Sequence, residues 1–114
     1  MVTAGMTPSE FAALADRTLV SIEDAVTALA EDGDIDIEAS RSGPVLTIEC
    51  EDRSKVIVNS QESMQEIWIA ARSGGLHFRH DGSHWVDTRG GADLWAALSR
   101  CLTEQAGQLV TLAG

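Results

Sequence analysis

The sequence has no apolar run near the roughly 20 residues that a membrane-spanning helix needs, so we expect no membrane span. Its first residues lack the basic stretch and the apolar segment of a signal peptide, which predicts a cytoplasmic protein. Cysteine is scarce: Cys50 and Cys101 lie far apart, without a CxxC partner or a histidine at zinc-ligand spacing. We therefore expect two free thiols that pack as small apolar groups, and no structural zinc site.

Basic residues are also scarce, because eight lysines and arginines stand against 18 aspartates and glutamates. Residues 1–52 hold 12 of the acids and two of the bases, whereas residues 53–114 hold six of each. The net charge of −10 therefore lies in the first half of the chain. Such a field repels nucleic acid and anionic membranes and attracts cations and basic protein surfaces, so we expect no nucleic-acid or membrane partner.

The 114 residues are enough for one domain with one hydrophobic core. We expect residues 1–8 to form a short N-terminal lead and residues 9–114 to form that single domain. A helix is predicted from Pro8 and Ser9 to Gly33, a candidate left-handed terminator. Its apolar positions recur at helical spacing: Phe11, Leu14, Ala15, Thr18, Ile22, Ala25 and Leu29.

Beyond this helix the hydrophobic period changes to two, which predicts strands. About six are expected, at residues 34–38, 45–51, 55–59, 66–71, 76–80 and 84–87. Most of the turns between them are of hairpin length, which favours an antiparallel meander. A second helix is predicted to end at Gly107, before an apolar tail that packs near the helices. Because two helices can cover only one face of the sheet, the predicted fold is an α+β two-layer sandwich.

Acidic side chains gather on one side of the predicted first helix. At about 100° per residue, Asp16, Glu23, Asp24 and Glu31 fall within an arc of about 100°, opposite the apolar stripe. We expect these acids to face water and to remain unpaired with Lys or Arg.

The strand predicted at residues 34–38 adds Asp34, Asp36 and Glu38 on its outward face. If this strand lies beside the helix, one continuous acidic strip forms. Carboxylates without histidine or cysteine suit hard cations such as iron(III), calcium, magnesium or manganese. Exposed carboxylates on regular elements form no cage, so binding should be weak, multiple and salt-sensitive. The alternative is an ordinary solvated helix face that binds nothing.

Trp68 alternates with Ile67 and Ile69 in the fourth predicted strand. Two isoleucines should take the helix-covered face, which leaves Trp68 on the open face as a typical interface anchor. The alternative is a shifted register that buries Trp68. The other two tryptophans, Trp85 and Trp95, are assigned to the core.

Three histidines, His77, His80 and His84, surround one predicted hairpin, where His80 and His84 could meet across the strands. They are compatible with a transition-metal site. Solvent-facing polar positions of a hairpin are the simpler interpretation.

The order of the strand motifs is specific, although no single piece is. Asn59-x-Gln61 is followed after six residues by Trp68-x-Ala70, and after three more by Gly-Gly-x-His-Phe at residues 74–78. With the acidic amphipathic helix before them, these motifs resemble the frataxin family in its bacterial CyaY form, from about residue 9 to residue 112. The chain departs from the family at Thr27 and Ala28, where relatives often carry acids, and at Ser63, which replaces a common proline.

The resemblance implies a sheet with two helices on one face, and weak iron binding along the ridge formed by the first helix and first strand. The corresponding ridge positions are Glu23, Asp24, Glu31, Asp32, Asp34, Asp36 and Glu38, with Glu49 and Glu51 as secondary candidates. It also implies docking to a cysteine desulfurase near the iron–sulfur scaffold protein. The corresponding contact residues are Asn59, Gln61 and Trp68.

Two functions agree with these expectations. The first is an iron-binding regulator of iron–sulfur cluster assembly, which binds the desulfurase and scaffold and delivers iron. The second is an acidic adaptor of the desulfurase with incidental metal binding. An enzyme such as an iron oxidase needs a protected redox site, whereas this sequence offers only exposed carboxylates. We therefore expect the protein not to be an enzyme. We also expect a monomer without an organic cofactor.

Overall fold

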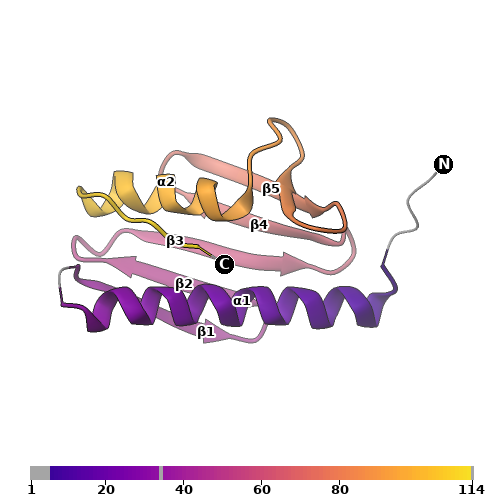
Figure 1. Ribbon diagram of the computed structural model, residues 1–114, viewed down its shortest axis with the longest axis horizontal. Helices are drawn as coiled ribbons and strands as arrows, with labels where there is room; N and C mark the ends of the chain where they lie inside the picture. Colours follow the sequence, from indigo (N-terminus) through magenta and orange to yellow (C-terminus); the bar gives the residue numbers. More distant parts are fainter. Residues whose placement is uncertain (1–5, 34, 114) are drawn as a thin grey trace.

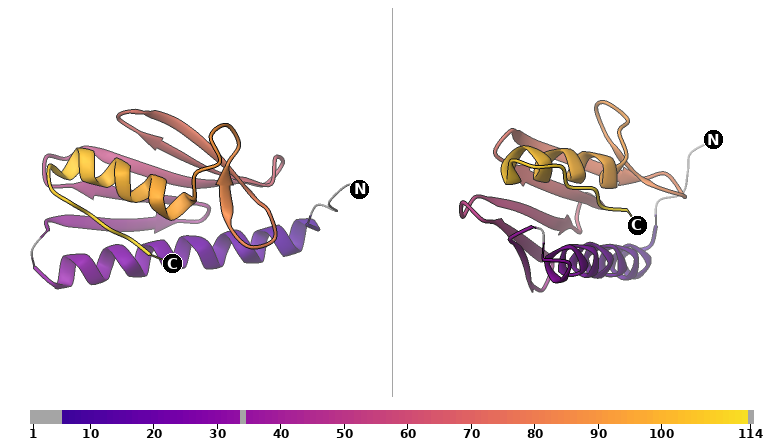
Figure 2. Two further views of the ribbon diagram at one scale, coloured as in Figure 1. Left: turned by 45° about the horizontal axis from the view of Figure 1, so that its top comes forward. Right: turned by 60° about the vertical axis from the view of Figure 1, so that its left-hand side comes forward.

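The computed structural model describes residues 6–33 and 35–113. These residues form one sheet with two helices, α1 and α2, on one of its faces (Figures 1 and 2). In chain order the elements are α1 (Pro8–Glu31), β1 (Ile37–Ser42), β2 (Val45–Cys50), β3 (Lys55–Gln61), β4 (Glu66–Ala71), β5 (Gly74–His80), β6 (Trp85–Asp87) and α2 (Leu94–Ala106). The strands pair antiparallel in sequence order. The predicted two-layer α+β sandwich is therefore confirmed.

Helix α1 begins at Pro8, as predicted, with a capping box that involves Thr7. The Thr7 hydroxyl accepts a hydrogen bond from the Glu10 N–H at 3.1 Å, and the Glu10 carboxylate accepts one from the Thr7 N–H at 2.8 Å. Pro8 occupies the first helical position, where its missing N–H costs nothing. The chain leaves the helix through Gly33, whose φ of 82° strains any residue with a side chain.

Strand β1 begins later than predicted. The sequence pattern placed a strand at residues 34–38, whereas β1 is Ile37–Ser42. Asp36 precedes the strand, and Asp34 lies outside the described residues. The predicted bounds were wrong at both ends of the strand. Residues 41 and 42 stand directly before Gly43 and Pro44 and have the composition of a turn. They continue the strand, since they lie opposite Leu46 and Val45 of β2.

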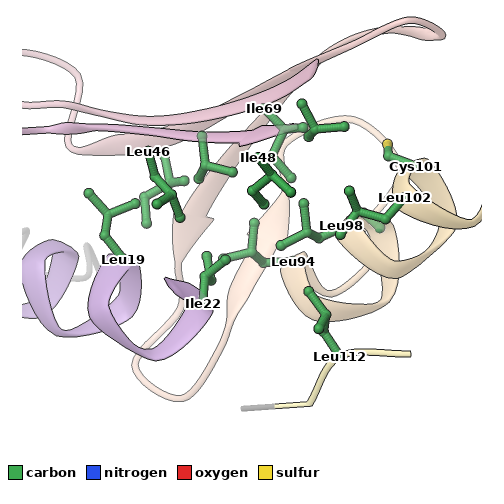
Figure 3. Close-up of a cluster of buried hydrophobic side chains, with 14 of the residues drawn as sticks. Leu19, Ile22, Leu46, Ile48, Ile69, Leu94, Leu98, Cys101, Leu102 and Leu112 are labelled. Carbon is green, nitrogen blue, oxygen red and sulfur yellow. The ribbon is translucent and has the colours of Figure 1, made fainter. Parts of the chain in front are cut away.

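The core lies between the sheet and the two helices (Figure 3). Its largest fully buried side chains include Leu19, Ile22, Leu46, Ile48, Ile67, Ile69, Phe78, Leu94, Leu98 and Leu102. Cys50 and Cys101 are buried free thiols, as expected. Trp85 is buried and donates a hydrogen bond to the Thr18 hydroxyl at 3.0 Å, whereas Trp95 is only half-buried at the margin.

Helix α2 and the tail close the open end of the core. The Asp93 carboxylate accepts the Trp95 N–H at 2.9 Å at the start of α2, and Gly107 ends the helix with a φ of 73°. The tail then runs back along α2, where Val110 hydrogen-bonds Thr103 at 2.9 Å (Figure 1). The expected packing of the tail near the helices is confirmed. In the described part of the chain, neither helix is long and apolar enough to cross a membrane.

Candidate functional site

An open hollow of about 510 Å³ lies between the C-terminal end of α1 and the neighbouring strands β1 and β2. Five carboxylates line it: Glu31, Asp36, Glu38, Glu49 and Glu51. We call this hollow, with its five carboxylates, the acidic hollow. Glu31 is the last residue of α1, and the other four lie within or directly beside the first hairpin of the sheet. The hollow therefore joins acids from both parts of the predicted strip, the helix and the residues that follow it, to Glu49 and Glu51.

Strand register concentrates the charge of the acidic hollow. Glu38 of β1 lies directly opposite Glu49 of β2, so two like charges face each other across the strands. Such pairs destabilise a sheet. On the other side of Glu49 lies Lys55 of β3, which forms no ion pair within 4.0 Å among the described residues. A bound cation or a basic partner would relieve this repulsion.

Pairing within the protein neutralises one acid of the predicted strip. Arg41 of β1 forms an ion pair with Asp16 of α1, so the expectation that the whole acidic arc is unpaired was wrong for Asp16. The cause is the longer β1, which carries Arg41 alongside the helix. Within the described residues, no other strip acid and no member of the acidic hollow forms an ion pair. Arg53 also lines the hollow without forming one.

The structure brings some of the predicted ridge residues together and leaves others apart. Glu31, Asp36 and Glu38 share the acidic hollow with both secondary candidates. Glu23 is half-buried and Asp24 is exposed on α1, outside the hollow, and the exposed Asp32 caps the helix C-terminus. The ridge is therefore a looser strip of acids that leads into one concentrated hollow.

The donor set of the acidic hollow suits hard cations, although it is not a preformed metal cage. Within residues 6–33 and 35–113, no group of three or more His, Cys, Asp or Glu side chains is arranged to hold a metal ion. Burial raises the pKa of the Cys50 thiol in the hollow wall, so it stays protonated at neutral pH. Oxygen ligands therefore remain for a cation that keeps much of its hydration.

Asp52, in the turn after β2, is expected to titrate far below an ordinary aspartate. The Ser54 side chain and backbone N–H donate to its carboxylate at 2.6 and 2.9 Å, and Arg72 adds a bond at 3.1 Å. These bonds lower the pKa of Asp52 from 3.8 to about 2. Because they favour the charged form in the fold, the turn is stabilised above pH 3.8 and loses that contribution as the pH falls through about 2.

The measurement is a carboxyl-carbon NMR titration of Asp52. A Ser54→Ala variant, which lacks the hydroxyl donor, should raise the pKa towards the ordinary value. A wild-type midpoint near 3.8 would show that these hydrogen bonds do not persist in solution.

A second candidate surface is the open face of the sheet, opposite the helices. Ile67 and Ile69 are 0% and 1% exposed, which confirms that Trp68 takes the other face. Asn59, Trp68 and His77 lie in one row across β3, β4 and β5. Trp68 is half-buried there, and its indole stacks on the His77 ring at 4.2 Å with an interplanar angle of 6°.

The neighbouring row continues this surface. It contains Gln61, Glu66 and Arg79, which lie opposite one another across the same three strands. Gln61 also donates to the Asn59 side chain at 2.7 Å. All three predicted contact residues therefore share one face, and two of them are hydrogen-bonded to each other.

The three histidines, all within the described residues, do not form the transition-metal site that the sequence allowed. His77 lies on the open face, while His80 contacts Trp85 edge-on at 5.1 Å. His84 belongs to the turn, because the residue opposite His80 is Trp85. The prediction that His80 and His84 could meet across the strands was therefore wrong.

Glu66 is the buried member of this surface, and the sequence prediction missed it. Its residue is only 3% exposed, which is unusual for a glutamate on an uncovered sheet face. The one signal in the sequence is its spacing of two from Trp68, which places both side chains on the same face. Its burial follows from Arg79 and His77 on the next strand.

Comparisons with known proteins agree with this architecture. A family model described as a frataxin-like domain matches residues 4–108. The chain is 54% identical over 107 residues to a protein from Cupriavidus metallidurans named iron-sulfur cluster assembly protein CyaY, covering 94% of this chain and 96% of that protein. It is 58% identical over 102 residues to a protein of the same name from Bordetella petrii, covering 90% and 94%.

Two solved structures are similar in fold. Frataxin from Psychromonas ingrahamii superposes with a TM-score of 0.83 at 29% identity, over 96% of this chain and all of that one. Trimeric frataxin from the yeast Saccharomyces cerevisiae, in complex with ferrous iron, has a TM-score of 0.71 at 23% identity, over 94% and 92% of the two chains. Because its sequence identity is low, the similarity to the yeast structure shows the fold alone.

Proposed function

This chain belongs to the frataxin family in its bacterial CyaY branch, and on that basis we propose that it acts in iron–sulfur cluster assembly. In this proposal it is a cytoplasmic, monomeric, non-enzymatic protein that binds iron weakly as cargo. It regulates assembly by binding the cysteine desulfurase and the scaffold protein. The names of its close relatives support the pathway, and the acidic hollow supports the chemistry.

The observation that carries the proposal is the unpaired charge of the acidic hollow. Five carboxylates and one guanidinium line it, and none of them is held in an ion pair among the described residues. A hydrated ferrous ion is attracted by this field and can exchange its water for carboxylate oxygens. Because no cage restrains the ion, it also leaves readily, as the delivery of iron requires.

The same field favours a basic protein surface. Solvent-exposed charges across an interface mainly raise the association rate and select the partner. The open sheet face, with Asn59, Gln61 and Trp68, supplies a second contact surface, whose aromatic anchor is Trp68. We therefore assign the acidic hollow to attraction of iron and the desulfurase, and the Trp68 face to tight contact with the desulfurase–scaffold complex.

Anaerobic titration with ferrous iron tests the iron-binding part. Amide signals of residues 31, 36–38 and 49–51 should shift and broaden first, because these residues line the acidic hollow. Glu38→Gln should weaken the effect, whereas Glu104→Gln, a matched change at an exposed position of helix α2, should not. Perturbations spread evenly over all acids would contradict an iron site at the hollow.

The second candidate function is an adaptor whose acids serve only to bind a basic partner. The lack of a preformed metal cluster in the described residues favours it. The two functions differ in one result: a regulator alters desulfurase activity more strongly when iron is present, and Glu38→Gln reduces that difference. An adaptor alters the activity equally with and without iron.

A further inference from the structure

Glu66 is a buried carboxylate on a sheet face that no helix covers. Its side chain is 5% exposed, whereas that of Arg79 is 63% exposed and that of His77 is 47% exposed. Three groups surround its oxygens. The Trp68 indole N–H donates to one oxygen at 2.8 Å, and Arg79 Nε donates to the other at 3.0 Å. His77 Nδ1 lies 3.6 Å from the oxygen that accepts the indole bond.

Strand register builds this arrangement. Glu66 and Trp68 are two residues apart on β4 and therefore point to the same face. Arg79 lies directly opposite Glu66 on β5, and His77 lies directly opposite Trp68. Between β4 and β5, Glu66 and Arg79 thus form an ion pair, and Trp68 and His77 beside them form a ring stack. The indole N–H of Trp68 bonds one pair to the other.

The consequence is a tryptophan with a fixed ring plane. Stacking on His77 holds one surface of the indole, and the bond to Glu66 fixes the rotation of the ring within that stack. A tryptophan free to change rotamer would lose that freedom on binding, which weakens association. A tryptophan held before binding avoids this loss.

We propose that Glu66 is the positioning residue of the docking surface: its carboxylate holds the Trp68 indole against His77, so that the partner meets a rigid anchor. This inference rests on the proposed function, in which the Trp68 face contacts the desulfurase–scaffold complex. The role of Glu66 depends on its oxygen acceptor, since Arg79 is exposed and can be solvated without it.

Two substitutions of nearly equal volume isolate that acceptor. Glu66→Gln and Glu66→Met both remove the charge, and only glutamine keeps an oxygen for the indole N–H. In proton NMR of the isolated protein, the stacked indole shifts the His77 ring protons upfield. We expect this shift in the wild type and in Glu66→Gln, and its loss in Glu66→Met. A retained shift in Glu66→Met, or equal losses in both variants, overturns the inference.

Binding to the purified desulfurase–scaffold complex is the second readout. Glu66→Met should bind about three- to ten-fold more weakly, whereas Glu66→Gln should stay within about two-fold of the wild type. If Trp68→Ala weakens binding while Glu66→Met, with its shift lost, binds like the wild type, the positioning role is overturned. If the wild type does not bind the complex, the proposed function fails, and the NMR comparison alone decides the role of Glu66.

Trp68→Phe provides an independent variant in case Glu66→Met does not fold. It removes the N–H donor and leaves the carboxylate in place. Binding weakened by about three- to ten-fold supports a role for the indole–carboxylate bond, and wild-type binding overturns it.

Discussion

Replacing Glu38 by lysine is expected to weaken binding to the desulfurase by roughly 30- to 100-fold, or about 2–3 kcal/mol, with little change in stability. Glu38 is exposed and unpaired among the described residues, and it faces Glu49 across the hairpin. Reversal of its charge removes one attraction to a basic partner and introduces a repulsion. It also relieves the repulsion from Glu49, so the free energy of unfolding should not fall. Calorimetric titration at two salt concentrations measures the affinity and its salt dependence.

Glu104→Lys is the matched control for this prediction. Glu104 is exposed on α2, and its nearest cationic contact is Arg100 at 3.9 Å. The substitution changes the net charge by the same amount at a distance from the hollow. If the two variants weaken binding equally, overall charge and not the acidic hollow attracts the partner.

Alanine at Ile69 should lower the free energy of unfolding more than alanine at Trp68 does. Ile69 is 1% exposed in the core, so Ile69→Ala should lower the free energy of unfolding by about 2–5 kcal/mol. Trp68 is half-buried on the open face, and loss of its ring stack should lower that free energy by only about 0.5–1.5 kcal/mol. Urea denaturation, with an unchanged slope, measures both values.

Partner binding should show the reverse order for these two variants. Trp68→Ala should weaken binding to the desulfurase–scaffold complex by about 2 kcal/mol or more, roughly 30-fold, because an exposed tryptophan on a rigid strand is a typical binding hot spot. Ile69→Ala, measured where it is still folded, should bind almost as the wild type does. Equal losses of stability in the two variants would mean that Trp68 is a core residue in solution.

Much of the fold was predictable because burial repeats locally along the chain. The alternation of Ile67, Trp68 and Ile69 alone indicates which side chain leaves the core. Gly33 and Gly107 mark the ends of the helices, since both need a left-handed backbone that other residues rarely adopt. These features depend on neighbours within a few residues, so they can be read without the tertiary structure.

The errors arose where the chain contacts itself at a distance. Arg41 and Ser42 have the composition of a turn, yet pairing with the next strand keeps them in β1. The longer strand then carries Arg41 to Asp16, which lies 25 residues earlier in the sequence. Composition could not show either result, because both depend on where the edge strand lies relative to α1.

The sequence by itself determined that acids outnumber bases in the first half of the chain, and that Trp68 and two isoleucines take opposite faces of one strand. Only the tertiary structure decided that Glu49 and Glu51 join Glu31 in one hollow, and that Glu66 is buried and hydrogen-bonded to the Trp68 indole. The physical reason is that periodicity assigns a side chain to a face. Which charges become neighbours on that face depends on strand register and helix placement, which are set by the packing of the whole core.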